Sequence, residues 1–124
     1  MNLYRIHHIE TVAPLHYRVS VALDPEHPVF AGHFPGNPVL PGVCSLQMII
    51  ECAGEALGFP VMMIEAPVVK FLEIIRPTSD SELVIDILAN DELTVKAAIT
   101  SGERKVVSCS IKLKKLDKTE MKWN

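Results

Sequence analysis

The stretch PGVCSLQMIIECAGEALGFP, Pro41–Pro60, decides the fold, because it predicts a long helix that is apolar on nearly every side. Pro41 suits the first position of a helix, where its missing N–H costs nothing. Gly58 suits a C-terminal cap and Pro60 blocks any continuation, so we expect the helix to run to Leu57. A helix that is apolar nearly all round is buried. We therefore expect a sheet to wrap around it.

Three polar side chains interrupt this apolar surface. Gln47, Glu51 and Glu55 recur at intervals of four residues, so they form a single stripe along one side of the helix. The stripe must meet something polar, which can be water, a partner subunit or a substrate.

The segments on either side of the helix predict strands. Val19–Leu23 alternates between apolar and polar residues, as a half-buried strand does. After the helix, the turn sequences PTSD, NDE and SGE separate four further expected strands. These are Val61–Ile75, Glu82–Leu88, Leu93–Thr100 and Lys105–Leu116. A strand, one long helix and an antiparallel meander indicate the α+β class, in a single domain over residues 1–124.

Composition narrows the classes of function. The chain has 124 residues, of which 48% are hydrophobic and 22% charged, as in a packed domain. Its net charge of −3 gives no general reason to expect nucleic acid as a partner. We expect no secretory signal and no membrane span, since no run approaches the ~18 apolar residues that a span needs. The three cysteines are odd in number and form no CxxC, which favours reduced core thiols in a cytoplasmic protein. The histidines show no ligand spacing, so we expect no metal site.

The loop before the helix carries the most specific signal. From Asp24 to Pro41 it holds five prolines and two glycines, which mark a constrained loop. Its end, HFPGNPVLPGV at residues 33–43, resembles the active-site loop of the 3-hydroxyacyl-[acyl carrier protein] dehydratases, which have the hotdog fold. KFLEIIRP at residues 70–77 resembles a strand of the same family. The resemblance extends from about His16 to the last strand.

This resemblance implies both an architecture and a reaction. Five or six antiparallel strands would wrap the helix, and two protomers would form a homodimer, which can stack further, with each active site across the interface. The reaction would remove water from a 3-hydroxyacyl thioester to give a trans-2-enoyl thioester. It would serve fatty-acid or related polyketide or polyene lipid synthesis. The substrate would be held on the phosphopantetheine arm of an acyl carrier protein, and no cofactor or metal would be required.

The resemblance also implies roles for named residues. His33 would be the base that takes a proton from C2 of the thioester, since a histidine pKa lies near neutrality. The backbone N–H groups of Gly42 and Val43 would stabilise the charge on the thioester oxygen, because Pro41 occupies the first helical position. Gly42 would also let the thioester approach closely. An apolar tunnel for the acyl chain would be lined by Phe34, Val39, Met48 and Phe71.

The chain departs from the family pattern on the helix. The family carries a carboxylate where this chain has Gln47, and commonly a glutamine where this chain has Glu51. An amide can hydrogen-bond a hydroxyl, but it cannot deliver a proton as a carboxylic acid does. Glu51 lies ~6 Å further along the axis and leans back over the preceding turn, among apolar neighbours that we expect to bury it. We hypothesise that His33 is the base and that Glu51, assisted by Gln47 through one water, handles the leaving group.

Other functions stay open at this point. Glu51 could activate water against the same thioester, as in a hotdog thioesterase. The chain could also be a non-catalytic subunit that binds carrier protein or completes the site of an active partner. In the plainest alternative, His33 satisfies backbone carbonyls, Gln47 bonds across a dimer interface and Glu51 is solvated.

Two further segments allow more than one interpretation. The sequence IKLKKLDK, residues 111–118, alternates apolar and basic residues, which favours lysine protection of an edge strand. With Lys70 and Arg76 it could instead form a landing patch for an acidic carrier protein. His27 could frame the site, although packing is the simpler role. Cys44 is better explained as a small core residue than as a nucleophile.

Overall fold

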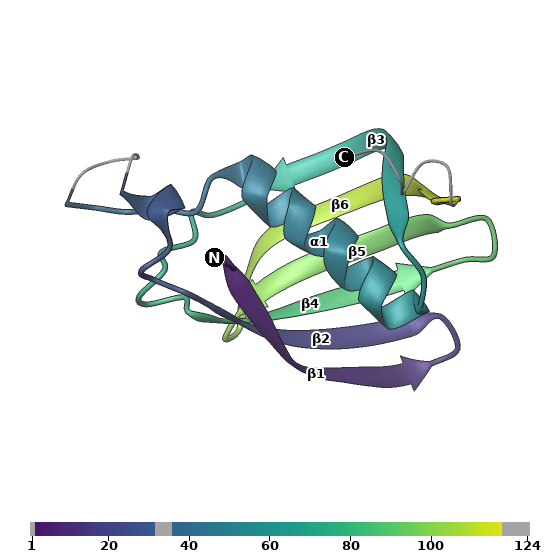
Figure 1. Cartoon of the computed structure of the whole chain (residues 1–124), viewed down its shortest axis with the longest axis horizontal. Helices are drawn as coiled ribbons and strands as arrows, with labels where there is room; N and C mark the ends of the chain where they lie inside the picture. The colour runs from purple at the N-terminus through teal and green to yellow at the C-terminus, as the bar shows by residue number, and fades with distance from the viewer. Residues whose placement is uncertain (1, 32–35, 118–124) are drawn as a thin grey trace.

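The structure is a computed structural model that describes residues 2–31 and 36–117. A six-stranded antiparallel sheet curls around one helix (Figure 1). The strand order across the sheet is β1-β2-β4-β5-β6-β3. The elements in chain order are β1 Tyr4–Ala13, β2 His16–Leu23, a short 3₁₀ turn η1 Pro28–Phe30, α1 Gly42–Leu57, β3 Val61–Phe71, β4 Glu82–Ala89, β5 Thr94–Ser101 and β6 Arg104–Lys115.

Helix α1 ends where the sequence predicts. Gly58 follows Leu57 in the left-handed conformation with φ 88°, and its N–H donates to the Gly54 carbonyl at 2.9 Å. A side chain at φ 88° would be strained, which is why glycine suits this cap. The start differs by one residue, because Pro41 is the extended N-cap (φ −60°, ψ 143°) and Gly42 is the first helical residue.

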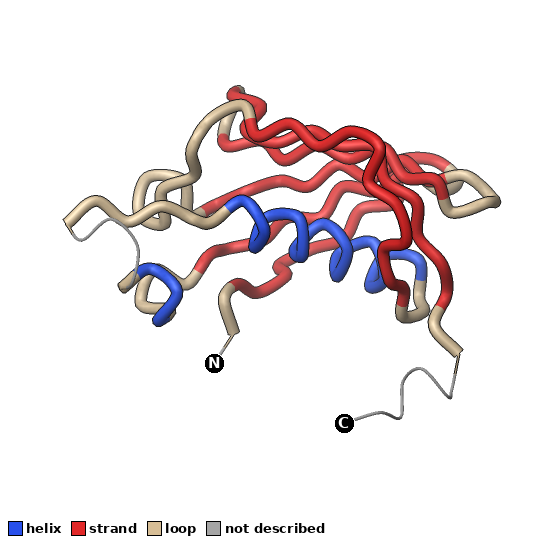
Figure 2. Tube along the Cα trace, turned by 90° about the horizontal axis from the view of Figure 1, so that it is seen from above, coloured by secondary structure: helices blue, strands red, loops and turns tan. Residues whose placement is uncertain are grey.

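The core lies between α1 and the concave face of the sheet, and Figure 2 shows the helix running along that face. One side of the helix is fully covered by the sheet. The buried residues of this side are Ser45, Met48, Ile49, Cys52 and Ala53. The other side stays open, since Val43 is 73% exposed and the polar stripe faces outward. The prediction that the sheet wraps the helix is confirmed, but one chain covers only part of its surface.

Strand β1 was not expected from the sequence. A register shift between Ile6 and His8 breaks its alternation, so the half-buried Ile6 and Ile9 stand three positions apart. A strict period of two therefore fails to detect this strand. β3 is also shorter than predicted, because it ends at Phe71 instead of Ile75.

The prediction that residues 111–118 belong to an edge strand is wrong. β6 lies between β5 and β3, and Ile111 is paired with Val95 of β5. On its other side, Lys112 is paired with Glu65 of β3. The outer strands of the described sheet are β1 and β3.

β3 presents an apolar edge to solvent. Large apolar side chains are exposed along it and in the segment that follows: Met62, Ile64, Val68, Phe71, Leu72 and Ile74. An exposed strand edge with this many apolar side chains favours association with another chain. Among the described residues, no helix is long and apolar enough to cross a membrane. All three cysteines are free, and Cys52 and Cys109 are buried.

A buried carboxylate braces the loop between β3 and β4. Asp80 accepts hydrogen bonds from the backbone N–H of Arg76 at 2.8 Å and the Ser101 hydroxyl at 2.6 Å, and Arg104 adds an ion pair at 2.5 Å. Burial alone would raise the pKa of Asp80, but these donors and the Arg104 charge outweigh it and lower that pKa below its usual value. The same loop holds the start of α1, because the Ile75 carbonyl accepts from Leu40 N–H at 2.8 Å.

Candidate active site

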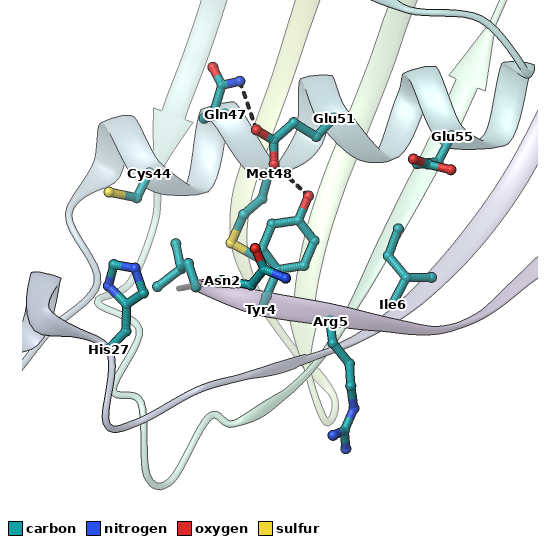
Figure 3. Close-up of a pocket in the computed structure, with 11 residues that line it drawn as sticks. Asn2, Tyr4, Arg5, Ile6, His27, Cys44, Gln47, Met48, Glu51 and Glu55 are labelled. Carbon is teal, nitrogen blue, oxygen red and sulfur yellow. Dashed lines mark hydrogen bonds between the residues drawn. The ribbon is translucent and has the colours of Figure 1, made fainter.

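The polar stripe of α1 borders a cavity of about 770 Å³ between the helix and the start of β1 (Figure 3). β1 provides one wall, α1 the other, and the loop after β2 closes one end. The lining residues are Asn2, Leu3, Tyr4, Arg5, Ile6, His27, Cys44, Gln47, Met48, Glu51 and Glu55. Two of the predicted catalytic residues, Gln47 and Glu51, thus share one cavity.

Glu51 is held by two donors. The amide nitrogen of Gln47 donates to Oε2 of Glu51 at 3.0 Å, and the hydroxyl of Tyr4 donates to Oε1 at 2.7 Å (Figure 3). Gln47 and Glu51 are therefore in direct contact. Each carboxylate oxygen keeps a further lone pair for a substrate group.

The surroundings of Glu51 differ from the expectation. Glu51 is exposed in the single chain, because its side chain leaves the helix on the side that the sheet does not cover. Its apolar neighbour Met48 is 1% exposed and forms the inner wall of the cavity. Gln47 and Glu51 also border a second recess of about 540 Å³, next to Ile50 and Gly54. The carboxylate thus stands on a ridge that a ligand can approach from two sides.

In the first turn of α1, the backbone N–H groups of Gly42 and Val43 have no hydrogen-bond partner within residues 2–31 and 36–117. The N–H of Cys44 donates to the Pro41 carbonyl at 3.0 Å, so hydrogen bonding along the helix begins at Cys44. Gly42 and Val43 precede it and belong to the N–H groups that a helix leaves outside its own pattern. The ring of Phe71, which is 54% exposed, lies close to Gly42. A Cβ atom there would lie 2.9 Å from Cζ of that ring.

The predicted tunnel residues are not brought together by the single chain. Phe71 and Gly42 line a recess of about 460 Å³ on the other side of the helix start from Met48. Val39 and Pro41 are half-buried in the segment that leads into α1. His33 and Phe34 lie outside the described residues, so the base and the tunnel stay predictions.

His27 lies at the loop end of the cavity, near Cys44 (Figure 3). Its Nδ1 atom accepts from Val29 N–H at 3.0 Å and so caps η1. The neutral ring therefore carries its hydrogen on Nε2. That His27 frames the site stays a prediction, and the cap on η1 gives this residue a structural role.

The contribution of β1 to the site, above all that of Tyr4, was not expected from the sequence. One signal was available, because Tyr4 and Ile6 alternate with Arg5 as one face of a strand would. The contact itself joins residues 47 positions apart, so no local pattern could reveal it.

Comparison with known proteins identifies a family for the chain. A family model described as ApeI dehydratase, of the ApeI-like family, matches residues 10–111. The 3-hydroxyacyl-[acyl-carrier-protein] dehydratase FabZ of Levilactobacillus brevis is 32% identical in an alignment of 93 residues that covers 68% of this chain and 62% of the relative. The FabZ of Zymomonas mobilis is 40% identical over 55 residues, which are 40% of this chain and 35% of the relative. The matched segments thus span less than two thirds of these curated relatives.

A solved structure supports the same fold. The chain is similar to one in a structure described as the dehydratase heterocomplex ApeI:P from Xenorhabdus doucetiae, with a TM-score of 0.71 and 26% identity. That match covers 88% of this chain and 96% of the other. A protein from Pyrococcus horikoshii, at 15% identity and a TM-score of 0.67, shows the same fold alone. Since the family model spans most of the sequence and the sheet wraps the helix as in these neighbours, this hotdog-fold chain belongs to the ApeI-like dehydratase family.

Proposed function

We propose that the chain is a hydro-lyase that removes water from a 3-hydroxyacyl thioester on an acyl carrier protein to give the trans-2-enoyl thioester. Membership of a dehydratase family supports the reaction class. The names of the curated FabZ relatives support the carrier-bound substrate. The pathway would be fatty-acid synthesis or related polyketide or polyene lipid assembly, in the cytoplasm, where three free thiols are expected.

One observation carries the proposal. The exchanged pair Gln47 and Glu51 forms a direct hydrogen bond at the edge of a cavity, so the carboxylate is present and oriented despite its displacement by one turn. In the proposed mechanism Glu51 protonates the departing hydroxyl from C3. Gln47 can remain bonded to it in both charge states, because an amide offers a donor and an acceptor.

The other roles follow from the chemistry of elimination. His33 would remove the proton from C2, as a base whose pKa lies near the working pH. Negative charge would then build on the thioester oxygen, and the N–H groups of Gly42 and Val43 would stabilise it. Since the stripe on α1 is exposed in one chain, we infer that the loop of a second protomer brings its His33 to the Glu51 of the first.

The dimer would form through β3. Its apolar edge, with Ile64 and Val68 exposed, would pair with a second copy and extend the sheet across both protomers. The carrier protein would meet basic side chains near the site, such as Lys70, which is exposed on β3. Arg76 is a weaker candidate for that contact, because it already donates to Asn37.

Hydration of a trans-2-enoyl thioester on a carrier protein tests the reaction in its reverse direction. Glu51→Gln and His33→Ala should each lower kcat about 100-fold or more, because each removes one partner in proton transfer. Glu103→Gln, in the exposed turn after β5, is the matched control and should leave turnover unchanged. Full activity of Glu51→Gln would refute the assigned role. Release of free thiol without hydration would identify a thioesterase instead.

A second candidate is a subunit that completes a heteromeric dehydratase. The displaced carboxylate favours it, and the solved relative is described as a heterocomplex. In that case the chain alone would not hydrate the enoyl thioester, and mixing with a second hotdog chain would restore the reaction. In the mixture, Glu51→Gln should still abolish the gain, because this chain would supply that half of the site.

A further inference from the structure

We propose that Tyr4 is a positioning residue for Glu51, fixing one carboxylate oxygen so that the other faces the substrate. This inference rests on the proposed function and adds a residue to its site. The main observation behind it is the hydrogen bond of 2.7 Å from the Tyr4 hydroxyl to Oε1 of Glu51. It joins the start of β1 to the middle of α1 across the cavity (Figure 3).

The backbone fixes the place of Tyr4. It is the first residue of β1 and pairs with Leu23 of β2, and the preceding Leu3 carbonyl accepts from Asp24 N–H at 2.8 Å. The pairing of Tyr4 and the hydrogen bond at Leu3 thus set the direction of the Tyr4 side chain. Tyr4 is half-buried and its ring points from the strand toward the helix (Figure 3). A rigid strand holds a side chain more closely than a loop does.

Tyr4 can act toward Glu51 only as a hydrogen-bond donor. Burial and the neighbouring Glu51 carboxylate raise the pKa of Tyr4 well above its usual value, so the phenol keeps its proton. It is therefore a constant donor to Oε1. A held donor of this kind orients a carboxylate without exchanging a proton with it.

Gln47 behaves differently from Tyr4. Its amide nitrogen donates to Oε2 when Glu51 is ionised, and a half-turn of the amide presents its oxygen to a proton on Oε2. Oε2 is consequently the oxygen at which the proton can come and go, while Oε1 is held by Tyr4. Without Tyr4 the exposed Glu51 carboxylate would be held by Gln47 alone, and either of its two oxygens could accept that hydrogen bond.

Tyr4→Phe removes only the hydroxyl, and Tyr17→Phe is the matched control. Tyr17 lies half-buried on β2, and its hydroxyl has no hydrogen-bond partner among the described residues. In enoyl-thioester hydration, Tyr4→Phe should lower kcat about 10- to 100-fold with KM little changed, while Tyr17→Phe leaves both constants unchanged.

A double-mutant cycle with Glu51→Gln separates positioning from general stability. Because Tyr4 acts through Glu51, Tyr4→Phe should cost little more once Glu51 is glutamine. The same loss in both backgrounds would overturn the proposal, since it would indicate an effect on the fold.

An NMR measurement that does not depend on turnover tests the role of Tyr4 separately from the proposed function. In protein carrying ¹³C-glutamate, the carboxyl signal that Glu51→Gln removes should move in Tyr4→Phe and stay in place in Tyr17→Phe. An unmoved signal would overturn the proposal even in an active enzyme. Inactive wild-type protein with a moved signal would refute the proposed function and leave the contact between Tyr4 and Glu51 established.

Discussion

Replacing Asp80 by asparagine should weaken the whole fold, because this carboxylate ties three segments together. Its side chain is 4% exposed and accepts from Arg76 N–H, the Ser101 hydroxyl and Arg104. Asparagine has nearly the same shape but loses the charge and turns an NH₂ group toward one of these donors. Losing charge-assisted hydrogen bonds at a buried site costs about 2–3 kcal/mol. For a chain of this size that corresponds to a fall in Tm of roughly 6–15 °C.

Urea unfolding followed by circular dichroism measures this free energy, with the protomer concentration held fixed because association would shift the midpoint. Asp86→Asn is the matched control. Asp86 also accepts from a histidine and an arginine, at 3.0 and 3.3 Å, but its side chain is 40% exposed. Its replacement should cost about 0.5 kcal/mol or less.

The pH dependence gives a second check on Asp80. Its pKa is lowered in the folded protein, so the carboxylate stabilises the fold above the unfolded pKa of about 3.9. That contribution is lost as the pH falls through the lower, folded value. The stability gap between wild type and Asp80→Asn should therefore be full at neutral pH and begin to close only below about pH 4. A gap under 0.5 kcal/mol at neutral pH, on the order expected for Asp86→Asn, would refute the reasoning.

Three further outcomes are expected. Met48→Ala should destabilise the chain by about 2–4 kcal/mol in the same urea assay, because it leaves a cavity where a side chain only 1% exposed was packed. A cost below about 1 kcal/mol would contradict this buried packing. At pH 8, a thiol reagent should modify Cys44 first, because Cys52 and Cys109 are buried and Cys44 is not; burial raises the pKa of all three thiols, that of Cys52 to about 12. Ile64→Lys should shift sedimentation from dimer to monomer, and an unchanged dimer would exclude β3 as the interface.

The helix was predictable because its ends are marked locally. Pro41 and Gly58 each act through their own backbone preferences, and α1 begins and ends within one residue of the expected positions. The wrapped sheet followed from the absence of a polar face on most of that helix. These are properties of neighbouring residues, so a single sequence carries them.

β1 could not be found in the same way, because its bulge shifts the inward positions from an even to an odd spacing. The placement of β6 inside the sheet was missed for a related reason. Alternating lysines describe which face of a strand meets water, and they do not tell whether its edges are paired. Strand order is a long-range property that no local pattern contains.

The exchange of Gln47 and Glu51 places the carboxylate within reach of a donor on β1. On the helix alone, Glu51 and Glu55 are both exposed carboxylates, and only the amide of Gln47 beside Glu51 tells them apart. The Tyr4 hydroxyl adds a second difference, because it donates at 2.7 Å to Glu51. A carboxylate at position 47 would lie ~6 Å nearer the start of the helix, and Tyr4 would then face an uncharged amide. The chain thus keeps the carboxylate and the amide of the pair but moves the charge to the turn where β1 supplies a second donor.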